Sequence, residues 1–116
     1  MDNKIKIHRP FSPTIGQYRM TQNMIDDINE HVEDIVKNKK IAKKQDHGAN
    51  LAGKVSQEIR ISNEFLKKGL LNFIAIFVKN YIKFSEGDTI KHFNLINLWV
   101  VRQYKNEYNP THWHTG

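Results

Sequence analysis

Two histidines stand one residue apart near the C-terminus, in the segment NPTHWHTG. Imidazole nitrogen is a common ligand for divalent metals in proteins. In an extended segment, residues two apart point to the same side, so His112 and His114 would face one way and Trp113 the other. The pair therefore suggests a metal site. The motif is weak by itself, because two exposed or core-capping histidines give the same pattern.

The composition limits both the ligands and the setting. Cysteine is absent, so no disulfide can form and any metal must be bound by His, Asp or Glu. The N-terminal residues MDNKIKIHRP contain no secretory signal, and no apolar stretch approaches the ~20 residues of a membrane helix. We therefore expect an intracellular protein without a membrane partner. A length of 116 residues predicts a single domain over residues 1–116.

The formal net charge of +6 comes largely from one lysine-rich stretch, Lys37–Lys44, which follows an acidic stretch, Asp26–Asp34. A helix favours anions near its N-terminus and cations near its C-terminus. This order predicts a solvated helix end, and a phosphate-binding patch is the less favoured alternative. We therefore do not expect a nucleic-acid partner.

Two segments have the apolar spacing of amphipathic helices. The first, Met24–Val36, can be capped by Thr21 or Asn23 and should fade in the lysine run. The second, Phe65–Tyr81, carries a wide apolar stripe. Gly69 lies inside it and costs ~1 kcal/mol relative to alanine, which suggests that a neighbour approaches closely there.

Alternating apolar residues predict short strands around Ile5–Ile7, in Thr14–Met20 and in Val55–Ser62. Pro10 and Pro13 interrupt the first of them. The segment HFNLINLWVVRQYK is apolar on both faces in its middle, which predicts a central strand covered on both sides. Loops or turns are predicted at Asp46–Lys54 and Ser85–Thr89.

The segment INLWVVRQYKNEYNPTHWHTG resembles the 2-oxoglutarate- and iron-dependent oxygenases, most closely a prolyl-hydroxylase-like group common in phages of marine cyanobacteria. In that family a tryptophan-bearing strand leads through a tyrosine and a short polar loop to the first metal ligand. The residues that follow this course are Trp99, Tyr104, Tyr108, Asn109 and His112. The upstream segments PTIGQYRM, IDDINEHVEDIV and DHGANLAGKVSQE also resemble the family's N-terminal region.

The resemblance implies an α+β fold, namely the N-terminal part of a double-stranded β-helix (jelly roll) with two supporting helices. It also implies a hydroxylase in which two histidines and a carboxylate hold ferrous iron and a distal cation binds the cosubstrate 2-oxoglutarate. By resemblance, His112 is the first iron ligand, His114 a less certain second ligand, and Tyr104 a residue that binds the cosubstrate. The resemblance also implies a cytoplasmic location in a virus-infected bacterial host cell. The substrate is left open among a protein side chain, a nucleobase and a small molecule.

This sequence departs from the family pattern in two respects. His114 occupies the place of the carboxylate, and no distal histidine or cosubstrate-binding cation follows it. The earlier histidines do not stand in the motif; they are His8, His31, His47 and His92. We therefore expect a truncated jelly-roll dioxygenase that is inactive as this chain.

Two alternatives of other classes remain open. The chain could be a non-catalytic basic binding module acting through Lys37–Lys44, or an interaction fragment whose unpaired strand edge around Leu95–Val101 forms a homodimer. Single residues also have simpler interpretations. Trp99 could be core, Arg102 could pair with Glu107, and Asp46 with His47 could be ordinary turn residues.

Overall fold

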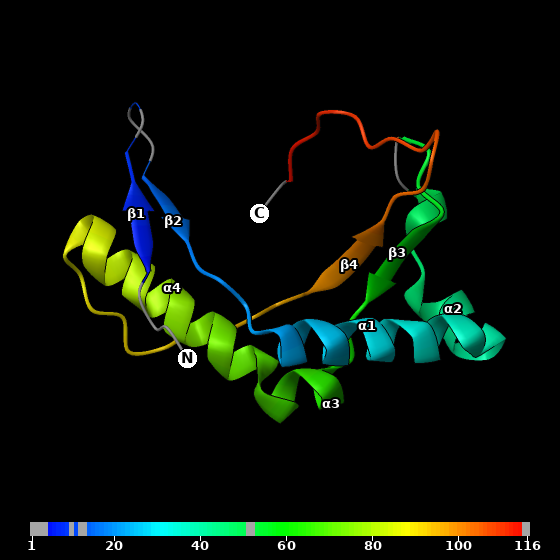
Figure 1. Ribbon diagram of the computed structural model, residues 1–116, viewed down its shortest axis with the longest axis horizontal. Helices are drawn as coiled ribbons and strands as arrows, with labels where there is room; N and C mark the ends of the chain where they lie inside the picture. The colour runs from blue at the N-terminus through cyan, green and yellow to red at the C-terminus, as the bar shows by residue number, and fades with distance from the viewer. Residues whose placement is uncertain (1–4, 10, 12–13, 51–52, 115–116) are drawn as a thin grey trace. The chain divides into compact units, whose positions relative to one another are not determined.

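The structure is a computed structural model that describes residues 5–9, 11, 14–50 and 53–114. Helices combine with two small antiparallel sheets, which confirms the expected α+β class (Figure 1). The chain divides into two compact units, each built from two segments. One contains Met1–Ile28 and Asn63–Ile96, and the other contains Asn29–Ser62 and Asn97–Gly116. Within the described residues, no helix is long and apolar enough to cross a membrane.

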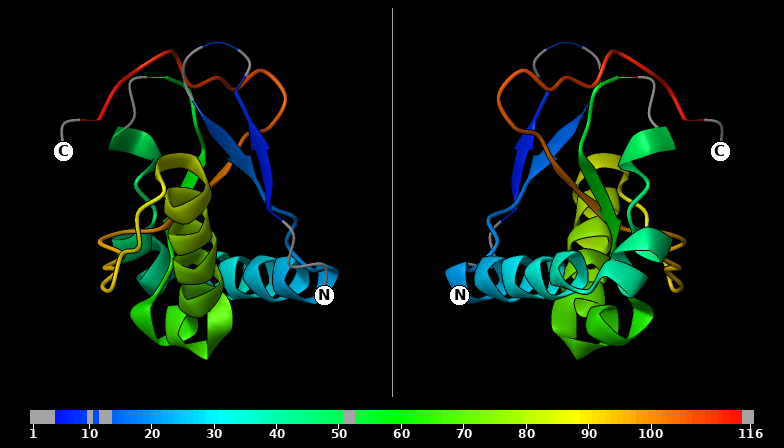
Figure 2. Two further views of the ribbon diagram at one scale, coloured as in Figure 1. Left: turned by 90° about the vertical axis from the view of Figure 1, so that its left-hand side faces the viewer. Right: turned by 90° about the vertical axis from the view of Figure 1, so that its right-hand side faces the viewer.

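The first unit begins with a hairpin of strands β1 (Lys6–His8) and β2 (Ile15–Gln17), which lie side by side in Figure 2. The second strand is shorter than the predicted Thr14–Met20. A Cβ atom on Gly16 would lie 2.6 Å from the Tyr81 ring, so glycine leaves room for that ring against the strand. Pro10 and Pro13, which are expected to interrupt the first strand, lie outside the described residues.

The helical part of the first unit is bent at Gly69. Helix α3 (Asn63–Phe65) continues through a π-helical turn, η2 (Leu66–Leu70), into helix α4 (Leu71–Glu86). The helical prediction for Phe65–Tyr81 is confirmed, but the predicted close approach at Gly69 is wrong. A Cβ there would meet no atom of the described residues within 4 Å, and glycine is needed because φ is 140°. Helix α4 also runs beyond the predicted turn start and ends at Gly87, where φ is 75°.

A hydrogen bond and a ring contact join the residues on either side of β2 to α4. The Tyr81 hydroxyl donates a 2.8 Å hydrogen bond to the Thr14 carbonyl. The ring of Tyr18 meets that of Phe73 edge-on, with centroids 5.2 Å apart. Edge-to-face pairs of this kind add to the free energy gained by burying the rings. These contacts explain how a two-stranded hairpin, which is marginal alone, is held in place.

Helix α1 (Gln22–Lys37) confirms the first predicted helix, and Thr21 caps it, because its Oγ1 accepts a 3.3 Å bond from Met24 N–H. Helix α1 ends at Lys37, which confirms that it fades in the lysine run, but the rest of that run is not a loop. A second helix, α2 (Lys39–Gln45), begins there. Asn38 adopts an extended backbone and its Oδ1 accepts the N–H groups of Lys40 and Ile41, which ends one helix and starts the next.

The second unit is built on strands β3 (Gln57–Arg60) and β4 (Trp99–Arg102), which pair antiparallel with Ile59 opposite Val100. Ile59 is fully buried, as is Val32 on α1. Arg102 lies on the same face of the sheet as Ile59 and donates a 2.7 Å bond to Glu33 of α1. The face that carries Ile59 is therefore turned toward α1.

The prediction of a long central strand covered on both sides is wrong. Only four of its residues form β4, and within the described residues β4 pairs with β3 alone. Trp99 is 41% exposed and Val101 38% exposed, and both lie on the face opposite Ile59. Apolar residues on both faces fit a strand that is covered on both sides. The sequence of the strand, however, does not show whether another part of the chain covers its second face.

Candidate metal centre

The segment that carries the two histidines leaves β4 through a tight turn. Glu107 N–H donates to the Tyr104 carbonyl at 3.0 Å, and the Glu107 carboxylate accepts Tyr104 N–H at 2.9 Å. Asn106 supplies the left-handed residue of the turn, with φ of 69°. These bonds fix the direction of the chain that continues, orange to red in Figure 1, toward His112.

A second anchor lies just before the histidines. Tyr108 N–H donates to the Lys54 carbonyl at 2.8 Å. A Cβ on Gly53 would lie 2.2 Å from the Tyr108 carbonyl oxygen and 2.6 Å from Pro110 Cδ, so only glycine allows this approach. The sequence pattern around Gly53 predicts only a loop and does not indicate this contact.

The two imidazoles lie close together. Their ring centroids are 5.1 Å apart and the planes meet at 68°. His112 Nδ1 lies 2.8 Å from the Pro110 carbonyl oxygen. Because a carbonyl can only accept, Nδ1 must donate, and in the neutral ring Nε2 then keeps its lone pair. Metal-binding histidines are commonly held in this way, with one nitrogen donating to a carbonyl and the other free to bind.

Trp99 contacts one of the two imidazoles, that of His114. Its ring centroid lies 5.9 Å from that of His114, with the planes tilted by 38°. Trp99 stands on β4 and His114 follows the loop, so the contact brings the end of the described chain back over the open face of the β3–β4 sheet. Trp113, between the two histidines, is 88% exposed.

Tyr104 is placed differently from the histidine pair. Its hydroxyl donates to Gln57 Oε1 at 3.3 Å. Gln57 pairs with Arg102 on the face of the sheet that carries Ile59, opposite the face of Trp99. A role of Tyr104 in cosubstrate binding stays a prediction. The suggested Arg102–Glu107 pair does not form, because Arg102 binds Glu33 and Glu107 accepts the backbone of Tyr104.

A hollow of about 210 Å³ opens on the same face as Trp99. It is lined by His47, Glu58, Arg60, Asn97 and Trp99. Glu58 and Arg60 were missed as candidates, although their alternation in a predicted strand could have placed them on one face.

Asp46 has the turn role that its residue type suggests. Its Oδ1 accepts Gly48 N–H at 2.9 Å and Glu58 N–H at 3.0 Å. The adjacent His47 N–H donates to the Glu58 carbonyl. The Asp46 carboxylate therefore fastens the loop that contains His47 to the edge of β3.

The donor set is incomplete for a ferrous site. In the part of the chain that the structure describes, no group of three or more His, Asp or Glu side chains is placed to hold one metal ion. Two imidazoles can supply two ligands to a divalent ion. They bring no negative charge, unlike the two-histidine, one-carboxylate set of non-haem iron enzymes.

Searches against protein-family models, curated proteins and solved structures found no match for this chain. Interpretation of the histidine pair therefore depends on its geometry and on the resemblance of residues 96–116.

Proposed function

We propose that His112 and His114 are metal ligands of a ferrous, 2-oxoglutarate-dependent hydroxylase, and that this chain supplies the N-terminal part of its jelly roll. The observation that carries the proposal is the meeting of the two imidazoles at 5.1 Å, with His112 Nδ1 held by the Pro110 carbonyl. That bond leaves the lone pair of Nε2 free to bind a metal. The resemblance of the surrounding segment supplies the reaction class.

The residues present fit the metal in part. His112 and His114 would hold it, while no third His, Asp or Glu ligand stands with them among the described residues. When bound, ferrous iron with 2-oxoglutarate supplies oxygen activation and hydroxylation of a C–H bond. This chain's own residues would orient one imidazole through Pro110 and pack the other against Trp99.

The fold supports the jelly-roll proposal through the β3–β4 pair. A jelly roll is built from antiparallel strands, and β4 leads directly into the loop that carries the histidines. Helix α1 covers one face of this pair, as a supporting helix would, through the Glu33–Arg102 bond. The open face carries Trp99 and meets His114.

The proposal is tested by metal titration of the purified chain. We expect weak binding of zinc, nickel or copper in preference to ferrous iron, because two imidazoles without a carboxylate favour these ions. His112→Ala should abolish the binding, and His114→Ala should weaken it by about tenfold or more. His92→Ala is the matched control, since this exposed histidine belongs to the other compact unit, and it should leave the affinity unchanged.

Binding should be followed by calorimetry and by the imidazole resonances in NMR spectra, which report which rings take the metal. Unchanged affinity in His112→Ala would refute the metal assignment. A separate assay follows succinate formed from 2-oxoglutarate with ferrous iron. We expect no turnover above background by the 116-residue chain, since its described residues lack a complete ligand set, and clear turnover would show that expectation to be wrong.

A further inference from the structure

We infer that the outer edge of β4 is the interface between two copies of this chain, which pair antiparallel with Trp99 of one copy opposite Val101 of the other. The inference is independent of the metal proposal, because the interface is made by a strand and requires neither His112 nor His114. Within the described residues, no strand and no isolated bridge pairs with β4 on the side away from β3.

The backbone of β4 shows which groups face this edge. Ile61 N–H donates to the Leu98 carbonyl, which continues the β3–β4 ladder by one residue. In an antiparallel ladder the bonded residues alternate, so Leu98, Val100 and Arg102 direct their backbone groups toward β3. The N–H and C=O groups of Trp99 and Val101 therefore point outward.

The same alternation is visible on the far side of β3. Glu58 sits between residues that bond to β4, and it directs its backbone groups away from β4. Its carbonyl accepts His47 N–H, and its N–H donates to Asp46 Oδ1. The loop thus satisfies the free edge of β3, while the matching groups of β4 have no such cover within the described chain.

A second copy fits this edge because the edge is complementary to itself. A two-fold axis at Val100 places Trp99 opposite Val101 of the second copy, and Val101 opposite its Trp99. Both pairs are then hydrogen-bonded pairs, so all four outward groups on each strand find partners. Indole and valine side chains meet across the strands, a pairing that stabilises antiparallel sheets.

The edge also lacks the features by which proteins prevent such pairing. Charged residues on an edge strand normally repel a neighbour. The one charged residue of β4, Arg102, lies on the opposite face and is bound to Glu33. Trp99 and Val101 are each more than a third exposed and apolar. A second copy would cover them while forming one four-stranded sheet.

Sedimentation of the chain over a wide concentration range tests the inference. We expect a reversible monomer–dimer equilibrium. Val101→Pro removes an outward N–H, which an edge strand tolerates, so it should leave the monomer folded by circular dichroism and abolish the dimer. The matched control Val101→Thr keeps both the N–H and the β-branch and should still dimerise. A wild-type chain that stays monomeric throughout, or a dimer unaffected by Val101→Pro, overturns the inference.

Charge pairing tests the register even if the proline variant fails to fold. One chain carries Trp99→Lys with Val101→Lys, and the other carries Trp99→Glu with Val101→Glu. Each alone should be monomeric through like-charge repulsion, and a mixture should form heterodimers. In wild-type NMR spectra, rising concentration should slow amide exchange at residues 99 and 101. A mixture that remains monomeric, or protection confined to other residues, rules out this interface.

Discussion

Arg102 Nη1 lies 2.7 Å from Glu33 Oε1 and joins strand β4 to helix α1. The two residues are 69 positions apart in the sequence. The Arg102 side chain is 21% exposed and that of Glu33 is 47% exposed. Water therefore screens the pair in part, and its contribution to the free energy of unfolding stays small.

A double-mutant cycle of Glu33→Gln and Arg102→Ala should give a coupling free energy of about 0.5–1 kcal/mol, decreasing with added salt. Arg102→Ala alone should cost more than Glu33→Gln alone, because the alkyl part of arginine also packs on the sheet. Urea unfolding measures both quantities. Glu30→Gln, on the exposed side of the same helix, is the control, and a coupling near zero at low salt would contradict the prediction.

The carboxylate of Asp46 should matter as a hydrogen-bond acceptor. It accepts the N–H groups of Gly48 and Glu58, so Asp46→Ala should lower the free energy of unfolding by about 1–2 kcal/mol. Asp46→Asn keeps an oxygen in the same place and should lose less. Equal losses in the two variants, measured by urea unfolding, would show that the charge and not the acceptor geometry is responsible.

The bend at Gly69 decides whether Gly69→Ala raises or lowers the free energy of unfolding. In a regular helix, glycine to alanine would stabilise the protein by about 1 kcal/mol. At φ of 140° the same change should destabilise it by about 1–3 kcal/mol, although no atom obstructs the new methyl group. Thermal unfolding distinguishes the two signs. Gly87→Asn is the comparison, because asparagine tolerates φ of 75° and should be nearly neutral.

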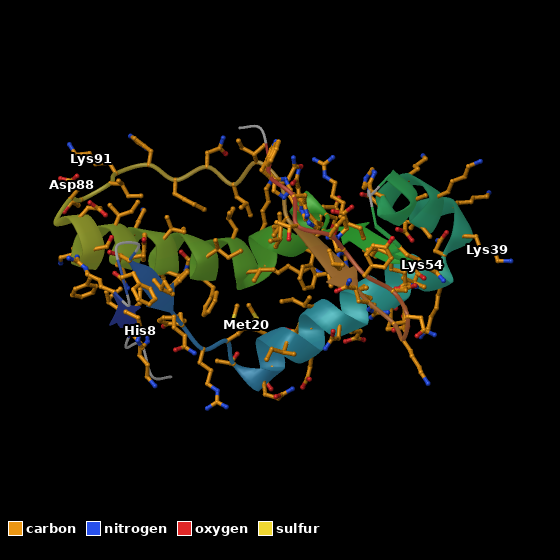
Figure 3. All side chains as sticks on the ribbon, turned by 90° about the horizontal axis from the view of Figure 1, so that it is seen from above. His8, Met20, Lys39, Lys54, Asp88 and Lys91 are labelled. Atoms are coloured by element: carbon orange, nitrogen blue, oxygen red, sulfur yellow. The ribbon has the colours of Figure 1, made fainter. Side chains whose placement is uncertain are left out.

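The lysines of α2 should be a solvated surface. All of them are exposed, and Figure 3 shows Lys39 extending away from its helix. We expect binding to duplex DNA at physiological salt to be no tighter than about 10⁻⁴ M, the weak end of non-specific affinity. Reversing Lys39, Lys40, Lys43 and Lys44 to Glu should then change little. Micromolar binding that disappears in this variant, followed by fluorescence anisotropy across a salt series, would favour a nucleic-acid partner.

Local features of the sequence determined the helices and the short strands. The apolar spacing of Met24–Val36 and the cap at Thr21 act within a few residues, and α1 forms where they predict it. The alternation in Val55–Ser62 likewise predicts β3. The end of α1 could also have been inferred, since Asn38 is a strong cap. The lysine charges in this stretch indicate a solvated surface, whereas the single residue Asn38 marks the division between the two helices.

Tertiary structure decided everything that depends on which segments meet. The sequence around Trp99 is apolar on both faces. Within the described residues, however, its strand pairs with β3 only, and this leaves Trp99 and Val101 exposed. Arg102 had an acidic neighbour nearby in sequence and instead binds a distant one. The sequence named His112 and His114. Their approach to 5.1 Å depends on the turn at Asn106, the close contact at Gly53 and the ring contact with Trp99. The contacts of Gly53 and Trp99 join residues distant in the sequence, so no local pattern encodes them.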